Sequence, residues 1–320
     1  MQTSPRDIWL VGAGPMARDY AKVLKALDVP TKVIGRGAES AAAFSAATGL
    51  DVVAGGLDQF LATAPAVPAG VIIAVGVEGL ADAATKVIRH GARHVLLEKP
   101  GALAGSELFA LEELARASGA RVVVAYNRRL YASTLKAQEL IAADGGVRSM
   151  NFEFTEWSHV IAPIKKADGV KPAWLLGNST HVIDLAFHLG GTPVDLHAYT
   201  AGALAWHPSS AVFAGAGRTD RDVLFSYQAN WDAPGRWGVE VLTSTLRLIF
   251  RPMESLQVMR KGSVAIEPVA IDDALDKAFK PGLHEQVRRF LAGDDAGTCS
   301  LSQQRLHWPL YERIAGYAAR

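Results

Sequence analysis

The sequence predicts an α/β protein of two domains, a Rossmann-type doubly wound parallel sheet followed by a mostly antiparallel sheet with helices on one face. Three observations support this prediction. A chain of 320 residues is long enough for two separate cores. Strand-like and helix-like segments alternate through residues 1–125, which is typical of a parallel sheet covered by helices. From residue 149 onward, short β-rich runs are joined by polar turns, as in antiparallel sheets.

The first half should contain five parallel strands, because five short runs are rich in valine, isoleucine and leucine. They are Ile8–Val11, Lys32–Ile34, Val71–Val75, His94–Leu97 and Arg121–Ala125. Segments of helical composition connect them and predict helices near Met16–Leu27, Glu39–Thr48, Leu80–His90 and Ser106–Ala117. One further helix, Tyr131–Ala142, should open the second domain, residues 126–320.

The second half changes in character, because its apolar residues recur in short or alternating runs. The expected strands are Met150–Glu156, Val194–Thr200, Val223–Trp231, Gly238–Val241, Leu246–Phe250, Leu256–Met259 and Val264–Ile266. The expected helices are His181–Leu189, Leu283–Leu291 and Ser302–Ala319. Arg236-Trp237 lies in a turn between two of these strands, and the sequence indicates no role for it.

Composition narrows the class of protein. A net charge of +1 gives no reason to expect nucleic acid or a membrane as a partner. Cys299 is the only cysteine, so neither an internal disulfide nor a cysteine-based metal cluster can form, and we expect no metal. Met1–Arg6 has no apolar core, and no stretch has the length of a transmembrane segment, so we expect a cytoplasmic protein without a signal peptide.

A glycine-rich turn directly follows the first strand. Gly12 and Gly14 would allow a tight turn and close approach of the backbone to a pyrophosphate, and Ala17 stands where a third glycine often does. Pro15 and Met16 begin the next helix, whose N-terminal N–H groups would face the phosphates. This pattern predicts a dinucleotide site, although methyltransferases and flavin enzymes share the same turn.

The end of the second strand decides which dinucleotide is expected. An NAD-binding chain usually carries Asp or Glu there to hold the ribose 2′-hydroxyl, but here Gly35 occupies the position and Arg36 follows. Arg36, with Ser40 close behind, would attract a 2′-phosphate, so we predict NADP rather than NAD. The alternative is that Arg36 is a solvated loop residue. Val75, at the end of the third main strand, should also border the dinucleotide.

Glu98, Lys99 and Pro100 end the strand His94–Leu97. An exposed ion pair is the commoner fate of such a Glu-Lys pair. However, ligands of open parallel sheets bind outside the carboxyl ends of the strands, and this strand should end at the same edge as the glycine-rich turn. We therefore predict that Glu98 and Lys99 border the cofactor.

Taken together, these motifs resemble the glucose–fructose oxidoreductase / inositol dehydrogenase / rhizopine-catabolism (Gfo/Idh/MocA) family. The resemblance rests on the glycine-rich turn, on Glu98-Lys99-Pro100, on Tyr126-Asn127-Arg128-Arg129 and on His181-Val-Ile-Asp184, in this order. It implies that Lys99 lies beside the nicotinamide and the reacting hydroxyl or carbonyl group of the substrate. It also implies a cis peptide bond between Lys99 and Pro100.

The helix His181–Leu189 carries a polar stripe, because His181, Asp184 and His188 fall within a sector of about 60°. The stripe suggests a helix lining a cleft, with Asn178 or Ser179 as its N-cap. In the family the motif is Asp-x-x-x-His-x-x-Asp, which implies that His181 is catalytic. Its first carboxylate is missing here, because Gly177 takes that place. Asp184 would hold the imidazole tautomer or serve the fold.

Several residues are expected to contact substrate. Asn127 and Arg128 lie where the first domain passes into the second, and Asn178 precedes the catalytic helix. Trp174 and Trp157 could stack on a sugar ring, with core packing as the alternative. The predicted substrate-binding residues are Asn127, Arg128, Trp174, Asn178, His181 and Asp184.

The sequence thus predicts an NADP-dependent oxidoreductase acting on a CH–OH group of a sugar, sugar acid or cyclitol, with Lys99 and His181 as catalytic residues. A non-catalytic dinucleotide-binding sensor of the same fold is the alternative, and the missing carboxylate at Gly177 favours it. We further expect strands from about Val223 to Ile266 to form a homodimer face, within a dimer or a tetramer, because wide apolar sheet faces are seldom left uncovered.

Overall fold

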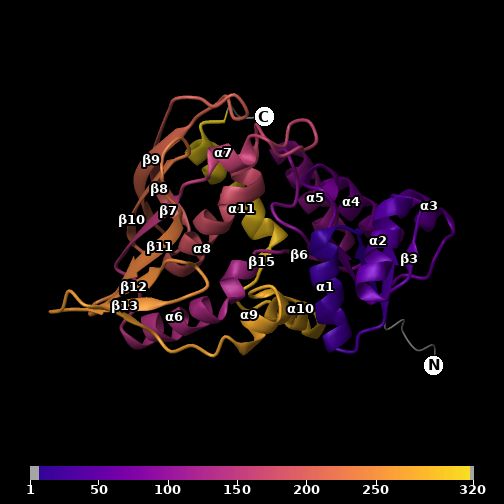
Figure 1. Ribbon diagram of the computed structural model, residues 1–320, viewed down its shortest axis with the longest axis horizontal. Helices are drawn as coiled ribbons and strands as arrows, with labels where there is room; N and C mark the ends of the chain where they lie inside the picture. Colours follow the sequence, from indigo (N-terminus) through magenta and orange to yellow (C-terminus); the bar gives the residue numbers. More distant parts are fainter. Residues whose placement is uncertain (1–6, 318–320) are drawn as a thin grey trace. The chain divides into compact units, whose positions relative to one another are not determined.

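The computed structural model describes residues 7–317, which form two compact units (Figure 1). The first contains the chain through Tyr126 together with Ala278–Arg305, and the second contains Asn127–Lys277 and the chain from Leu306 onward. A division into residues 1–125 and 126–320 therefore leaves out the return of residues 278–305 to the first unit. The reason is burial: Leu283, Val287 and Phe290 belong to the same apolar core as Ile8 and Leu10.

The sheet of the first unit has seven strands in the order β15-β6-β5-β4-β1-β2-β3. All neighbours are parallel except β15, which pairs antiparallel with β6. The strands are β1 (Ile8–Val11), β2 (Thr31–Ile34), β3 (Val52–Val53), β4 (Gly70–Ile73), β5 (His94–Leu97), β6 (Arg121–Val124) and β15 (Cys299–Ser300). The order 3-2-1-4-5-6 is that of a Rossmann fold, so the predicted class of the first domain is confirmed.

Helices connect these strands and bury their apolar sides against the sheet. They are α1 (Pro15–Ala26), α2 (Ala38–Thr48), α3 (Gly56–Ala62), α4 (Leu80–His90), α5 (Gly105–Ser118) and α10 (Leu283–Ala292). Helix α1 packs against α2 and α10, whereas α4 packs against α5. The positions of α4, β5 and the start of α10 are those predicted, because their apolar periodicity is unambiguous.

The second unit is built on an eight-stranded sheet in the order β14-β13-β12-β11-β7-β10-β9-β8, antiparallel except for the pair β7 and β10. The strands are β7 (Ser149–Phe154), β8 (Pro193–Ala201), β9 (Val212–Thr219), β10 (Leu224–Asn230), β11 (Trp237–Leu242), β12 (Leu246–Phe250), β13 (Gln257–Arg260) and β14 (Ile266–Pro268). The predicted mostly antiparallel sheet is confirmed.

Five helices contribute residues to this unit: α6 (Ala132–Ala143), α7 (Ser158–Ile161), α8 (Thr180–Gly190), α9 (Ala274–Ala278) and α11 (Leu301–Ala315). Helix α8 packs on β7 and β11 (Figure 1). It places ten of its eleven residues in the core, which makes it the central support of the second unit.

Strand β9 was absent from the expected elements, and its glycines explain why. Its sequence alternates small residues that weaken a strand pattern. A Cβ at Gly215 would overlap the phenol ring of Tyr227, and one at Gly217 would lie 2.7 Å from the ring of Phe225. The aromatic side chains of β10 therefore lie across β9 and require glycine there.

Two further expectations concern the chain ends and membranes. The predicted absence of a signal peptide concerns Met1–Arg6, which lies outside the described residues, and the helix predicted to reach Ala319 ends at Ala315. Among residues 7–317, no helix combines the length and the apolar character that a bilayer crossing requires.

Candidate functional site

The glycine-rich turn joins β1 to α1 in the geometry that phosphate binding needs. Gly12 has φ +125°, and a Cβ there would overlap the carbonyl oxygen of Ala74, just before Val75. Gly14 is the N-cap of α1, Pro15 is its first residue, and no side chain caps the helix. A Cβ at Gly14 would meet nothing within 4 Å. The first turn of α1 therefore has no side-chain cap and open space beside Gly14, which fits a pyrophosphate.

The end of β2 has no room for an acidic side chain. A Cβ at Gly35 would lie 2.8 Å from a methyl group of Val52 and 3.2 Å from Cβ of Ala13. Arg36 is exposed, and among the described residues its side chain has no hydrogen-bond or ion-pair partner. Ser40 is also exposed and donates its hydroxyl hydrogen bond to the carbonyl of Gly37. The packing that excludes a carboxylate at position 35 thus leaves Arg36 as the charged side chain that follows β2.

Glu98 and Lys99 follow β5 at the carboxyl edge of the same sheet, and the Lys99–Pro100 bond is cis, as predicted. The Tyr20 hydroxyl donates a 2.7 Å hydrogen bond to the Glu98 carboxylate, and the Gln286 amide donates to the Tyr20 oxygen at 3.1 Å. Burial raises the pKa of Glu98, opposed by the Lys99 ammonium and the Tyr20 hydroxyl. Burial and the Glu98 carboxylate also raise the pKa of Tyr20, which therefore stays a donor.

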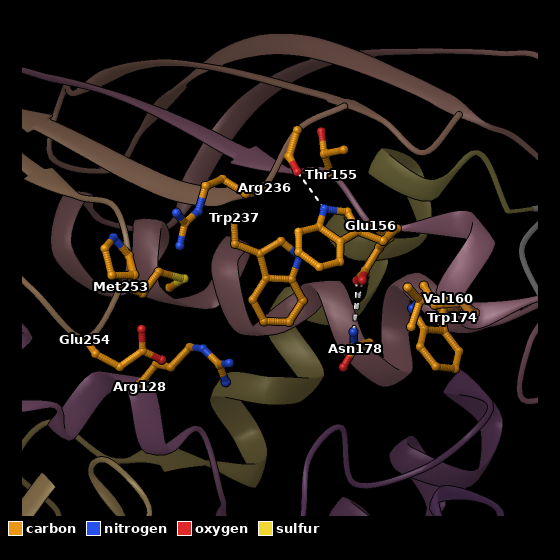
Figure 2. A pocket seen from close by; sticks show the side chains of 14 residues that line it. Arg128, Thr155, Glu156, Val160, Trp174, Asn178, Arg236, Trp237, Met253 and Glu254 are labelled. Atoms are coloured by element: carbon orange, nitrogen blue, oxygen red, sulfur yellow. Dashed lines mark hydrogen bonds between the residues drawn. The ribbon is translucent and has the colours of Figure 1, made fainter. Parts of the chain in front are cut away.

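A cavity of about 740 Å³ lies within the second unit (Figure 2). Aromatic side chains form much of its wall: Trp157, Trp174 and Trp237. The residues predicted to bind substrate divide into two groups, because Arg128, Trp174 and Asn178 line this cavity, whereas Asn127, His181 and Asp184 are not part of its lining. A cavity of this size and character is typical of small-molecule sites.

A buried carboxylate, Glu156, also lines the cavity. Its side chain is 6% exposed and accepts two hydrogen bonds from the Asn178 amide, at 3.0 and 3.2 Å, and one from the Ser179 hydroxyl at 2.7 Å. Figure 2 shows the Asn178 amide pointing at this carboxylate. Such charge-assisted hydrogen bonds hold the carboxylate in one place, where it can accept from a ligand hydroxyl.

The predicted N-cap role of Asn178 or Ser179 is wrong. A π-helical turn, Leu175–Ser179, runs directly into α8, so the backbone N–H groups at the start of α8 do not need a side-chain cap. Both side chains bind Glu156 instead. π-Helical turns often occur at functional sites, because they displace side chains from the regular helical surface.

Arg128 contributes a cation to the wall of the cavity. Its guanidinium lies 4.9 Å from the ring centroid of Trp237 and 5.7 Å from that of Tyr131. Its Nε atom is buried and has no hydrogen-bond partner. A guanidinium held by aromatic rings keeps its polar edge available for a ligand oxygen. Burial also raises the pKa of Tyr131 to about 12.

Two of the three polar residues on α8, Asp184 and His188, are hydrogen-bonded to other side chains of the protein. The Arg129 guanidinium donates two hydrogen bonds to the Asp184 carboxylate, at 2.6 and 2.8 Å, and both side chains are 1% exposed. His188 is hydrogen-bonded to the amide of Gln138 at 2.9 Å. Of the two roles considered for Asp184 within the protein, these contacts favour support of the fold, since so little of its surface can meet a substrate.

His181 is 7% exposed, and its ring centroid lies 6.3 Å from that of Trp237 in the cavity wall. His307 adds a second buried imidazole next to the ion pair of Arg129 and Asp184. Burial lowers its pKa to about 4, with the Asp184 carboxylate opposing the shift, so His307 is neutral near pH 7.

Sequence reasoning missed Glu156, Arg236 and Met253 in the cavity lining. Glu156 lies shortly after β7, which ends at Phe154, and Arg236 immediately precedes β11. Both residues therefore lie at strand ends of one sheet. The position of Glu156 at the end of a predicted strand could have identified it from the sequence. Nothing in the sequence indicated that residues around 253 approach the same cavity.

Comparisons with known proteins support a dinucleotide-binding fold in the first unit. Residues 6–126 match the family model GFO_IDH_MocA, described as an oxidoreductase family with an NAD-binding Rossmann fold. This match agrees with the resemblance predicted from the motifs, because the matched stretch contains the glycine-rich turn and Glu98-Lys99-Pro100. Among curated proteins, no sequence relative was found.

Solved structures share the fold over nearly the whole chain. A levoglucosan dehydrogenase in complex with NADH and L-sorbose is 18% identical with a TM-score of 0.80, covering 99% of this chain and 97% of its own. The UDP-N-acetylglucosamine 3-dehydrogenase GnnA from Acidithiobacillus ferrooxidans is 17% identical with a TM-score of 0.73, covering 97% of both chains. An oxidoreductase from Agrobacterium radiobacter, bound to NAD+, L-tartaric acid and magnesium, is 14% identical with a TM-score of 0.76, covering 97% and 95%.

Proposed function

We propose that this protein, whose residues 6–126 match the model of the GFO_IDH_MocA oxidoreductase family, is an NADP-dependent oxidoreductase of a CH–OH group in a polyhydroxylated small molecule, a sugar, sugar acid or cyclitol. The observation that carries the proposal is the position of Lys99. It follows β5 at the carboxyl edge of the sheet whose β1 leads into the glycine-rich turn. An ionisable side chain at that edge is placed to act on whatever reacts with the bound dinucleotide.

The preference for NADP rests on the end of β2. Packing excludes a carboxylate at Gly35, and Arg36 follows without a partner in the described chain. A guanidinium binds a phosphate with charge-assisted hydrogen bonds, whereas a ribose 2′-hydroxyl gains little from it. The proposed cofactor-binding residues are Gly12, Gly14, Pro15, Met16, Arg36, Val75, Glu98 and Lys99. When bound, the nicotinamide would supply the acceptor or donor of a hydride.

Lys99 is the proposed acid–base residue. Its ammonium would polarise the substrate oxygen, and its amine would take the hydroxyl proton in the oxidative direction. The neighbouring Glu98 is fixed by the Tyr20 hydroxyl, which is itself held by Gln286 from α10. This chain of hydrogen bonds limits the movement of the backbone that carries Lys99.

The cavity of the second unit is the proposed substrate pocket. Indole faces suit the C–H faces of a sugar ring, and Glu156, Asn178 and Arg128 offer an acceptor, an amide and a cation to hydroxyl or carboxyl groups. His181 is the proposed second catalytic residue, with the larger share in positioning substrate. Glu156 compensates for the missing carboxylate at Gly177, because it brings a fixed carboxylate to the turn that precedes α8.

A homodimer or tetramer through the sheet of the second unit is part of the proposal. Leu224 on β10 is 61% exposed and Ile266 on β14 is 52% exposed, so apolar side chains stand on the surface of these strands. Light scattering at micromolar concentration measures the assembly directly, and a monomer would contradict it.

The activity is tested with a panel of sugars, sugar acids and cyclitols, each with NADP and with NAD, by the absorbance of the reduced cofactor. We expect turnover with at least one member and with NADP preferred. Tight binding of NADP without any turnover over the whole panel would instead identify a dinucleotide-binding sensor.

A further inference from the structure

A second cavity, of about 650 Å³, adjoins the proposed substrate pocket within the same unit. The two share Trp157 and Gly235 in their linings. The second is otherwise formed by the start of α7 and by the loop between β10 and β11, including Ser158, His159 and Asp232. The first cavity alone is larger than one six-membered sugar ring. The second cavity extends the first beyond the indole of Trp157.

Trp157 is built as a fixed platform at this junction. Trp157 is 56% exposed, so its aromatic surface is open to a ligand. The indole Nε1–H donates a 2.8 Å hydrogen bond to the carbonyl of Gly235. The imidazole of His159 stacks on the same indole, with 6.3 Å between ring centroids and 17° between planes. An aromatic surface fixed in advance loses little entropy when a ligand ring stacks on it.

The charges of the two cavities differ. The first is lined by the cations Arg128 and Arg236 and by the carboxylates Glu156 and Glu254. The lining of the second contains no lysine or arginine, and its one carboxylate is that of the exposed Asp232. A diphosphate, such as the one in a UDP-sugar, would meet no cation there and one repelling carboxylate. A neutral ring with hydroxyl groups fits both the indole and the polar edges.

We propose that the substrate is a neutral glycoside of at least two rings, such as a disaccharide, with the oxidised ring in the first cavity and the second ring stacked on Trp157 in the second. The inference rests on the proposed function and specifies its substrate class. It assigns Trp157 and His159 to an extension subsite that decides between glycosides and single sugars. Trp157 belongs to both cavities, so its effect is read as a ratio between substrates.

The test compares cellobiose, maltose and sucrose with glucose, and UDP-glucose as the charged alternative, in steady-state assays with NADP. We expect the KM of the best disaccharide to be about tenfold below that of glucose, which corresponds to about 1.4 kcal/mol of binding free energy from the stacked ring. Trp157→Ala should raise the ratio of disaccharide KM to glucose KM about tenfold. Trp157→Phe should keep the ratio close to its wild-type value, because phenylalanine retains an aromatic face although it loses the hydrogen bond to Gly235.

Leu306→Ala is the matched control, since Leu306 is apolar, 61% exposed and outside both linings. It should leave the ratio unchanged. A glucose KM equal to or below the disaccharide values, a preference for UDP-glucose, or an unchanged ratio in Trp157→Ala would overturn the subsite while leaving the oxidoreductase intact.

Ligand-observed NMR with the full chain separates failure of the subsite from failure of the activity. Saturation transfer to cellobiose should be seen on both rings in the wild type and should weaken on one ring in Trp157→Ala. If no sugar is oxidised but this pattern appears, the proposed activity fails and the subsite stands. Absence of transfer to every disaccharide would refute the subsite.

Discussion

The two units prepare for ligands in opposite ways. In the first, the main chain forms most of the site. Gly12 allows its backbone to approach that of Ala74, and the uncapped N-terminus of α1 presents N–H groups. In the second, side chains form the cavity, with indoles, guanidinium groups and one buried carboxylate. The first site needs only a strand, a turn and a helix in succession, whereas the second needs side chains from the segment after β7, from α7, from the π-helical turn and from β11 to meet.

This difference predicts how each site responds to change. A main-chain site tolerates most side-chain substitutions but depends strongly on the few side chains that do chemistry beside it. A side-chain site depends on buried supports that never touch a ligand. Substitutions of residues that act on a ligand should therefore lower activity, whereas substitutions of the buried supports of the second unit should lower stability.

The largest expected effect is that of Lys99→Ala. Removing a positioned acid–base residue should lower kcat about 10²- to 10⁴-fold. The affinity for NADP, measured by quenching of tryptophan fluorescence, should change little, because the main chain holds the phosphates. Lys86→Ala removes a lysine of the same unit that is paired with Asp58 and Asp82 on the surface, and it should leave kcat unchanged.

His181→Asn sharpens this prediction. It should raise KM more than it lowers kcat, since it mainly removes ground-state binding of the substrate. The opposite pattern, with kcat abolished by His181→Asn and barely altered by Lys99→Ala, would show that the two roles are reversed.

In the second unit, Asp184→Leu should reduce stability by about 3–5 kcal/mol, because Arg129 is left buried without its carboxylate. Urea unfolding followed by tryptophan fluorescence reports mainly on this unit, which contains six of the seven tryptophans. Replacing both partners, Arg129→Met with Asp184→Leu, should recover much of the loss. Glu240→Gln breaks a partly exposed pair with Arg247 in the same unit and should change stability by less than about 1 kcal/mol. An Asp184→Leu loss no larger than this control would contradict the prediction.

The same contrast explains what the sequence could predict. The glycine-rich turn, Lys99 and the strands of the first unit are local patterns, so their places could be predicted from short segments. The buried partner of Asp184 lies 55 residues away in the chain. Glu156 and Asn178 meet across 22 residues, and Trp157 and Gly235 across 78. No periodicity records such pairs, because they depend on how the sheet brings strand ends together. Strand β9 was missed for a related reason, since its glycines are required by rings on β10.

A pH-dependent effect should also belong to the second unit. Burial lowers the pKa of His307 to about 4 in the folded protein, whereas an unfolded histidine has a pKa of about 6.5. The unfolded chain therefore binds more protons between these values, so this contribution is fully present above pH 6.5 and is lost as pH falls toward 4. Between pH 7.5 and pH 5 the loss should be about 2 kcal/mol. In His307→Gln the fall in urea stability over this range should be smaller by that amount, and an unchanged slope would refute the assignment.

The smallest expected effect tests Arg36, the side chain of the first unit that is proposed to choose between NADP and NAD. Arg36→Glu should reverse the preference between NADP and NAD, because the guanidinium that attracts a 2′-phosphate becomes a carboxylate that repels it. Arg36 is exposed, and solvent weakens the interaction, so we expect about a tenfold loss of NADP affinity rather than the hundredfold of a buried pair. Titration of both cofactors by tryptophan fluorescence measures the change.

Ser40→Ala is the matched control, since its hydroxyl already donates to Gly37, and it should change the ratio much less. The NADP effect should also shrink as salt is raised, because it is electrostatic at an exposed site. Wild-type protein that binds NAD more tightly than NADP, or an Arg36→Glu variant with the wild-type ratio, would show that main-chain contacts alone choose the cofactor. The division between the two units would then be complete, with no specificity carried by side chains in the first.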